Sequence, residues 1–326
     1  MSGDAADIAG NSKIIPPPEF HALMAGLGPF ERNPVIAIAC SGGPDSMALT
    51  LLADDWARNL GGRAIALIVD HGLREESAAE AKIVQERLKV QNIESEILTR
   101  RGGKITGDIQ AKARDARYSL MTQWCAHQNI LHLLFAHHQE DQAETLLIRL
   151  ERGSGVFGMS GMARIRETNQ VRILRPTLGL SRSRLRATID ARKVRFVEDP
   201  SNLDARFARV RIRQRLEKSG DARSALRLSE TASRMGAARA VLEDMLNEAL
   251  ARTCRIFPEG YCLVDWAGLA STPIDIRRRV LASVLTCVGA RAYTPRFKQV
   301  CTLAKTLTTD NGKPGVCLSV TLQYPA

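Results

Sequence analysis

A short apolar run followed at once by a glycine-rich turn is the feature of this sequence that most restricts its fold. Residues 35–40 read VIAIAC, and the next six residues read SGGPDS. A continuous apolar run of this length is typical of a strand buried on both faces of a parallel sheet. Two adjacent glycines allow backbone conformations that other residues avoid, and the pattern from Ser46 to about Leu60 predicts a helix. The sequence therefore predicts a strand–turn–helix unit.

The same alternation of strand and helix patterns continues to residue 150. We expect strands at 64–69, 93–98 and 131–136, and helices at 76–91, 109–128 and 139–150. Such alternation predicts an α/β fold, a parallel sheet with helices on both faces. Ligands of these sheets bind beyond the carboxyl ends of the strands, where the turn at 41–46 lies.

The flanking segments divide the chain into three expected parts. Residues 1–32 are predicted to form a loose N-terminal arm that ends in a short helix, with the prolines at 16–18 disfavouring helix there. Residues 33–220 form the predicted catalytic domain, and residues 221–326 a mainly helical domain that opens with a long helix at 225–252.

Other segments give weaker patterns. The glycine-rich residues 152–163 are expected to form a flexible loop. Helices are predicted near 181–193 and 204–217, and a short strand at 315–323.

The turn at 41–46 has the composition of a phosphate-binding loop. The N–H groups of Gly42 and Gly43 can turn inward to bind an anion, and the helix N-terminus adds partial positive charge. The hydroxyls of Ser41 and Ser46 can donate to phosphate. Asp45 would be repelled by phosphates unless a cation lay between them, so we assign it to Mg²⁺. The alternative is an ordinary tight turn that caps a helix.

Basic residues are concentrated in one fifth of the chain. Residues 151–220 contain 17 Arg and Lys against 7 Asp and Glu, a net charge of +10, and the whole chain carries +11. Fifteen of the 17 are arginine, which forms bidentate pairs with phosphate and stacks on bases. We interpret the block as a polyanion-binding surface with nucleic acid as the expected partner, against the alternative of a solvated face.

A second set of candidate residues follows the strand at 131–136. Asp141 and Glu144 are three residues apart, so they share one face of the predicted helix and suit a cationic substrate. The preceding His137 is a candidate for accepting a proton from an attacking ammonium, or for binding phosphate when charged. An exposed acidic pair and a capping histidine are the structural alternatives.

The cysteines and the apolar runs exclude several classes of protein. The seven cysteines are scattered and form no CxxC pair, which argues against a disulfide scaffold, a zinc site and an iron–sulfur site. No apolar run is long enough to span a membrane, and the N-terminus lacks the pattern of a secretion signal. We expect a cytoplasmic protein without a membrane partner.

Several motifs together resemble a known family. They include SGGPDS at 41–46, VDHGLR at 69–74, ARDARY at 113–118, AHHQEDQAET at 136–145, RGSG at 152–155, RP at 175–176, DPSN at 199–202 and FAR at 207–209. The first looks like the loop of PP-loop ATP pyrophosphatases. The set, in order over about residues 33–216, resembles the tRNA(Ile)-lysidine synthases.

This resemblance implies a reaction and its substrates. Such enzymes use ATP to adenylate the carbonyl oxygen at carbon 2 of the wobble cytidine of an isoleucine tRNA with anticodon CAU. The amine of L-lysine then displaces AMP to form lysidine. The implied cofactors are ATP and Mg²⁺, the implied partners are this tRNA and L-lysine, and the family suggests a monomer or homodimer.

The resemblance also implies roles for individual residues. The catalytic residues are Asp45, His137 and Arg209, where Arg209 neutralises charge on the transferred phosphoryl group or binds tRNA phosphate. Asp70 and His71 would line the adenosine pocket, with capping of the following loop as the alternative for Asp70. Asp141 and Glu144 would hold lysine, with Arg117 near its carboxylate. Residues expected to bind tRNA are Arg152, Arg182, Arg184, Arg186, Arg211 and Arg213.

Three other functions are compatible with parts of the sequence. A 2-thiolation enzyme of tRNA shares the loop but typically needs paired cysteines. A small-molecule ligase such as NAD or GMP synthetase would leave the arginine-rich block unexplained. A nucleic-acid-binding protein with an inactive nucleotide fold would have no need of Asp45 and both glycines.

Overall fold

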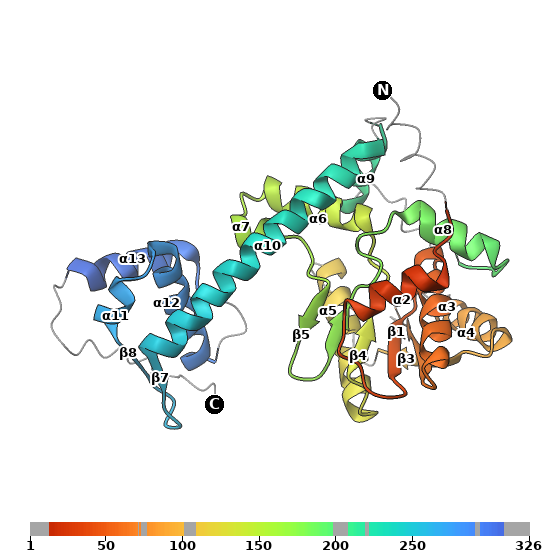
Figure 1. Cartoon of the computed structure of the whole chain (residues 1–326), viewed down its shortest axis with the longest axis horizontal. Helices are drawn as coiled ribbons and strands as arrows, with labels where there is room; N and C mark the ends of the chain where they lie inside the picture. Colours follow the sequence, from red (N-terminus) through yellow and green to blue (C-terminus); the bar gives the residue numbers. More distant parts are fainter. Residues whose placement is uncertain are drawn as a thin grey trace. The chain divides into compact units, whose positions relative to one another are not determined.

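The computed structural model of this chain describes residues 13–70, 72, 77–100, 109–197, 208–218, 222–290 and 294–309. The chain divides into two compact units, Met1–Gly236 and Ala237–Ala326 (Figure 1). The first unit is built around a six-stranded sheet, and the second is mainly helical. Within the described residues, no helix combines the length and the apolar composition that a membrane span requires.

The sheet of the first unit has the order β3–β2–β1–β4–β6–β5. Its strands are β1 (Val35–Ala39), β2 (Arg63–Asp70), β3 (Glu94–Thr99), β4 (His132–Leu134), β5 (Ile165–Glu167) and β6 (Arg172–Leu174). All neighbours are parallel except β5 and β6. The predicted parallel α/β sheet is confirmed, while the short strands β5 and β6 were not predicted.

Helices cover both faces of this sheet, as predicted. Alternate residues of β1 divide between two cores: Ile36 and Ile38 pack with α3 (Pro44–Asn59), whereas Ala37 packs with Met121 of α5 (Ile109–His127). Helices α4 (Ser77–Val90) and α8 (Arg182–Ala191) join the α3 side. A strand that is apolar at every position is thus explained by burial on both sides.

The described part of the N-terminal segment is not loose. Helix α2 (Pro17–Ala25) starts within the proline run, because proline is tolerated in the first turn, where the missing N–H has no partner in any case. Phe20 and Met24 are fully buried in the main core. The expectation that the prolines disfavour helix was therefore wrong for Pro17 and Pro18.

The glycine-rich segment after α6 (Gln139–Glu151) is held by side chains of α6. It contains a short helix, α7 (Val156–Met159), which we had expected to be loop. The Gln142 amide donates to the carbonyl of Met162 at 2.8 Å and accepts from its N–H at 2.6 Å. Arg149 donates to the carbonyls of Gly158 and Gly161.

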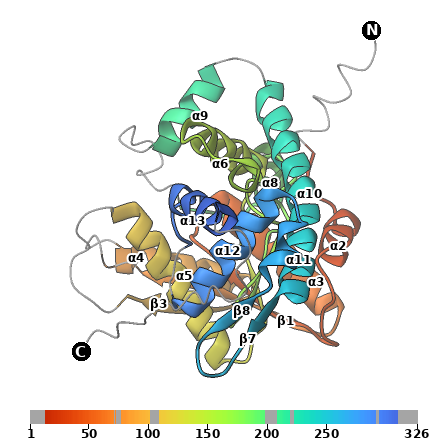
Figure 2. The same ribbon diagram turned by 90° about the vertical axis from the view of Figure 1, so that its left-hand side faces the viewer.

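The first unit continues with α9 (Ala208–Lys218) and the start of α10 (Ala222–Thr253). The second unit adds a hairpin, β7 (Cys254–Ile256) and β8 (Cys262–Val264), and helices α11 (Trp266–Ala270), α12 (Ile274–Val288) and α13 (Phe297–Thr309). Figure 2 shows α12 and α13 beside each other, and they are in contact. The hairpin was not predicted, and the strand expected at 315–323 lies outside the described residues.

Candidate active site

The turn after β1 is stabilised by its own serines. The hydroxyl of Ser46 donates to the carbonyl of Gly43 at 3.0 Å, accepts from the N–H of Ser41 at 3.2 Å and lies 3.2 Å from the Ser41 hydroxyl. Helix α3 starts at Pro44, directly after this turn. The turn therefore has a fixed geometry at a helix N-terminus, where an anion is favoured.

Gly42 is required in this turn for two reasons. Its φ of +81° lies in the left-handed region that favours glycine, and a Cβ there would stand 2.3 Å from Cγ2 of Val84 on α4. The carbonyl of Gly42 also accepts from the N–H of Val197 at 2.8 Å. The turn is thus packed closely between α4 and the segment after α8.

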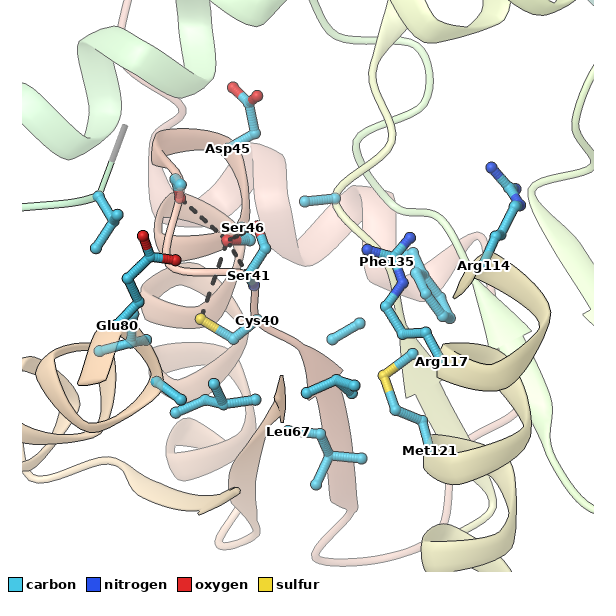
Figure 3. Close-up of a pocket in the computed structure, with 18 of the residues that line it drawn as sticks. Cys40, Ser41, Asp45, Ser46, Leu67, Glu80, Arg114, Arg117, Met121 and Phe135 are labelled. Atoms are coloured by element: carbon cyan, nitrogen blue, oxygen red, sulfur yellow. Dashed lines mark hydrogen bonds between the residues drawn. The ribbon is translucent and has the colours of Figure 1, made fainter. Parts of the chain in front are cut away.

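A pocket of about 420 Å³ opens at the carboxyl ends of β1, β2 and β4. One wall is the phosphate loop with Ser41, Asp45 and Ser46, and Arg114 and Arg117 of α5 stand on the opposite wall (Figure 3). His137 and Asp141 also line this pocket. The structure therefore brings His137 and the turn at 41–46 to one pocket, although they are far apart in the sequence.

Asp45 has the properties expected of a cation ligand. Its Oδ1 is buried and has no hydrogen-bond partner, while Oδ2 lies 3.7 Å from both Nε2 of His138 and Nε of Arg182. Burial raises the pKa of this carboxyl, against the opposing effect of His138 and Arg182. A single carboxylate together with substrate phosphates is a usual way to hold Mg²⁺, so these residues fit the metal.

His138 lies among three carboxylates at the start of α6. Nδ1 is 3.0 Å from Glu140, and Nε2 is 3.4 Å from Asp141 and 3.7 Å from Asp45. Burial alone would lower the pKa of His138, but Asp141, Glu140 and Asp45 together raise it to about 9. His138 is therefore a buried cation that balances this acidic cluster. We had not predicted a role for it.

His137 has the opposite electrostatic environment, although it is the next residue. Arg175, which is buried, donates from Nε to Nδ1 of His137 at 3.2 Å. Burial, with Arg175, Arg114 and Arg117 nearby, lowers the pKa of His137 to about 3 against the opposing effect of Asp141. The imidazole is therefore neutral near pH 7, so it does not bind phosphate as a cation. The sequence motif RP contained Arg175, but nothing in it indicated this contact.

The acidic pair on α6 lies as its spacing predicted, and an arginine of α9 contacts it. Glu144 is 1% exposed, and its Oε1 accepts from Nε of Arg213 at 2.7 Å; Arg213 also lies 3.9 Å from Asp141. The structure thus places Arg213, expected to bind tRNA, against the residues expected to bind lysine.

The remaining candidate residues lie in different parts of the first unit, and those that the structure describes make different kinds of contact. Asp70 caps the following loop, since its Oδ1 accepts from the N–H of Gly72 and the hydroxyl of Ser77. Arg184 pairs with Glu19 of α2 at 2.7 Å and donates to the backbone of the N-terminal segment, which indicates a structural contact. His71 lies outside the described residues, and Arg209 lies on α9.

The other arginines expected to bind tRNA are accessible to different extents. Arg152 and Arg211 are exposed. The half-exposed Arg186 pairs with Asp190 and stacks on Phe196 at 4.4 Å, and the equally exposed Arg182 is close to Asp45 in the pocket.

Comparison with known proteins agrees with this fold and site. A family model described as a PP-loop domain matches residues 19–219. The chain is also similar in fold to the U34-tRNA thiolase of Methanococcus maripaludis, with a TM-score of 0.57 and 16% identity over 67% of this chain and 78% of that one. The six-stranded sheet with its SGGPDS turn is therefore a PP-loop domain.

Several curated relatives show which family of PP-loop proteins this chain resembles. The chain is 39% identical over 269 residues to the tRNA(Ile)-lysidine synthase of Bradyrhizobium diazoefficiens, covering 80% of this chain and 74% of that one. The enzyme of the same name from the Wolbachia of Brugia malayi is 35% identical, with 90% and 68% covered, and that of Rhodopseudomonas palustris is 43% identical, with 68% and 66% covered. This chain belongs to the tRNA(Ile)-lysidine synthase family.

Proposed function

We propose that the protein ligates L-lysine to carbon 2 of the wobble cytidine of an isoleucine tRNA with anticodon CAU, and converts ATP to AMP and pyrophosphate. The observation that carries this proposal is the pocket itself. It joins the SGGPDS turn, two arginines of α5 and Asp141 in a chain whose relatives are tRNA(Ile)-lysidine synthases.

The first step transfers AMP to the tRNA. The carbonyl oxygen of cytidine attacks the α-phosphorus of ATP, and pyrophosphate leaves. The turn at 41–46 would bind phosphate oxygens, and Asp45 would hold Mg²⁺, which would supply positive charge beside the phosphates. Arg114 and Arg117 add positive charge from the opposite wall of the pocket.

In the second step the amine of lysine attacks carbon 2 of the adenylated cytidine, and AMP leaves with the bond electrons. Asp141 and Glu144 would bind one ammonium of lysine, and Arg117 its carboxylate. Arg213 contacts the same acids, so lysine would compete with it. Arg209 would neutralise charge on the phosphoryl group or bind tRNA phosphate.

Binding of the tRNA would use the exposed arginines at 152, 182, 186 and 211 and the mainly helical domain 221–326. Arg252 is 69% exposed and Arg255 is exposed near the hairpin of the second unit. Reversing both charges should weaken tRNA binding. The slope of the affinity against salt concentration should fall by the amount expected for the loss of about two phosphate contacts. An unchanged salt slope would remove this surface from the proposal.

The alternative of tRNA 2-thiolation is less well supported. Among the six described cysteines, Cys40 alone lines the pocket. The thiolase neighbour is 16% identical, which reflects a shared fold.

The test is lysine incorporation. Purified protein, ATP, Mg²⁺ and labelled lysine are incubated with the isoleucine CAU tRNA, and with the methionine CAU tRNA as control. Label in the first tRNA only, with AMP released, is the expected result. Binding of ATP and tRNA without incorporation would reject lysine ligation and leave thiolation, tested with sulfur donors.

A further inference from the structure

A column of stacked side chains supports His137 behind the pocket. The ring of Tyr118 stacks on Phe135 at 4.6 Å, and Phe135 stacks on His137 at 5.7 Å, with the rings nearly parallel in both pairs. The hydroxyl of Thr177 donates to the carbonyl of His137 at 3.0 Å. Both the ring and the backbone of His137 are therefore held in place.

Arg175 completes this support from the far side of the ring. It is 4% exposed, donates from Nη1 to the carbonyl of Ala163 at 2.7 Å and from Nε to Nδ1 of His137 at 3.2 Å. A guanidinium has N–H donors and no acceptor, and it stays protonated in proteins. Nδ1 of His137 must therefore be the acceptor, without a proton of its own.

This contact fixes the chemistry of the other ring nitrogen. A neutral imidazole with a bare Nδ1 carries its proton on Nε2, so Nε2 is a donor. Nδ1 is already occupied and Nε2 already holds a proton, which leaves no site on the ring that can accept one from an attacking ammonium. Desolvation of the ring and the three nearby arginines, which together outweigh Asp141, also disfavour a second proton.

We propose that Arg175 is a positioning residue that holds His137 as the Nε2–H tautomer, so that His137 donates a hydrogen bond to a phosphate oxygen of the nucleotide rather than acting as a general base. This inference rests on the proposed function and assigns His137 to the AMP-transfer step. A neutral, fixed N–H in a closed site stabilises developing negative charge without rearrangement. The phosphate loop and the arginines of α5 line the same pocket, so its ligand is an anion.

The tautomer is measurable without any activity. In protein labelled with ¹⁵N at histidine, two-bond ¹H–¹⁵N correlation spectra assign the proton of His137 to Nδ1 or Nε2. The expected result between about pH 5 and 8 is a neutral ring protonated at Nε2. A ring protonated at Nδ1, or at both nitrogens, would overturn the inference. Arg175→Gln should give a mixture of tautomers, while Arg166→Gln, which removes a nearby exposed arginine, should not.

Kinetics of the two half-reactions separate a donor from a base. Pyrophosphate release from ATP in the presence of tRNA reports AMP transfer, and lysine incorporation reports the complete reaction. His137→Ala and Arg175→Gln should each slow pyrophosphate release about a hundredfold. His137→Gln, whose amide also donates, should stay within about tenfold of wild type. A base could not be replaced by glutamine.

The outcomes distinguish this inference from the proposed function. If His137→Ala released pyrophosphate at the wild-type rate but transferred no lysine, His137 would be the base and the inference would fail. If the wild-type protein incorporated no lysine, the proposed function would fail, and the tautomer measurement would still decide whether Arg175 sets the state of His137. Arg175→Lys serves as the second variant if Arg175→Gln does not fold.

Discussion

Nε of Arg213 on α9 donates to Oε1 of Glu144 on α6 at 2.7 Å, and the Glu144 carboxylate is almost completely buried there. An arginine from the basic part of the chain thus balances a buried acid of α6. The contact fastens the two helices to each other, and α6 and α9 are in contact. It also gives the acid a cation when no substrate is bound.

Removal of Arg213 should destabilise the protein. Arg213→Gln leaves the Glu144 carboxylate buried without its guanidinium, so the free energy of unfolding should fall by about 3 kcal/mol. The matched control is Arg215→Gln, which breaks an exposed pair with Glu151 on the same two helices and should cost less than about 1 kcal/mol. Urea unfolding of the three proteins measures both values. Equal losses would mean that the buried pair contributes no more than the exposed one.

Substitution of Gly42 should disrupt the phosphate loop. Alanine at this position combines an unfavourable positive φ with a Cβ 2.3 Å from Val84, so Gly42→Ala should weaken ATP binding at least tenfold. Gly153→Ala is the control, because Gly153 also has a positive φ but has open space around its Cβ position.

The double variant tests the cause of this loss. Gly42→Ala with Val84→Ala removes the methyl group that collides, so it should regain part of the nucleotide affinity. Calorimetric titration of each protein with ATP gives the affinities. If the control lost as much affinity as Gly42→Ala, the backbone angle alone would account for the effect.

Asp45 should determine the dependence of nucleotide binding on Mg²⁺. In the wild-type protein, Mg²⁺ should tighten ATP binding, because the Asp45 carboxylate, whose Oδ1 is buried without a partner, needs a cation beside phosphate. In Asp45→Asn this difference should disappear, and pyrophosphate release should fall by about a hundredfold or more. Asp54→Asn, on the same helix but paired with Arg58, should keep the Mg²⁺ dependence. A Mg²⁺ effect that survived in Asp45→Asn would assign the metal to other residues.

The stability of the unliganded protein should fall at alkaline pH because of His138. Its pKa is raised from 6.5 to about 9 in the folded state, so its contribution is complete below pH 6.5 and is lost as the pH rises through 9. The expected loss is about 3 kcal/mol in the free energy of unfolding. His138→Gln should flatten this part of the pH profile, and the exposed His127→Gln should not. A slope that persisted in His138→Gln would belong to another group.

The sequence predicted the sheet and the turn between β1 and α3 because both depend on local patterns. A wholly apolar run such as 35–40 and a glycine pair leave few alternatives. The spacing of Asp141 and Glu144 likewise placed them on one face of α6. In contrast, β6 has three residues, one of them arginine, and it is a strand because of its pairing with β4.

What the sequence did not show are contacts between distant segments. Arg175 and His137 are 38 positions apart, and Arg213 and Glu144 are 69 apart, so neither pair follows from helix or strand periodicity. The opposite charge states of His137 and His138 also depend on contacts between distant segments. The two residues are adjacent and chemically identical, and Asp141 raises the pKa of both. The arginines near His137 and the further carboxylates near His138 make the difference.

The position of β1 between β2 and β4 also has a consequence for how the protein acquires its activity. Ile36 pairs with Ala64 on one side and with His132 on the other, so the second pairing must wait until a long stretch of chain is available. Closing such a large parallel loop is entropically slow. During synthesis β1 can pair first with β2, but the wall that carries His137 joins them only after β4 has emerged. The nascent chain is therefore expected to complete the pocket late, once β4 has joined the first two strands.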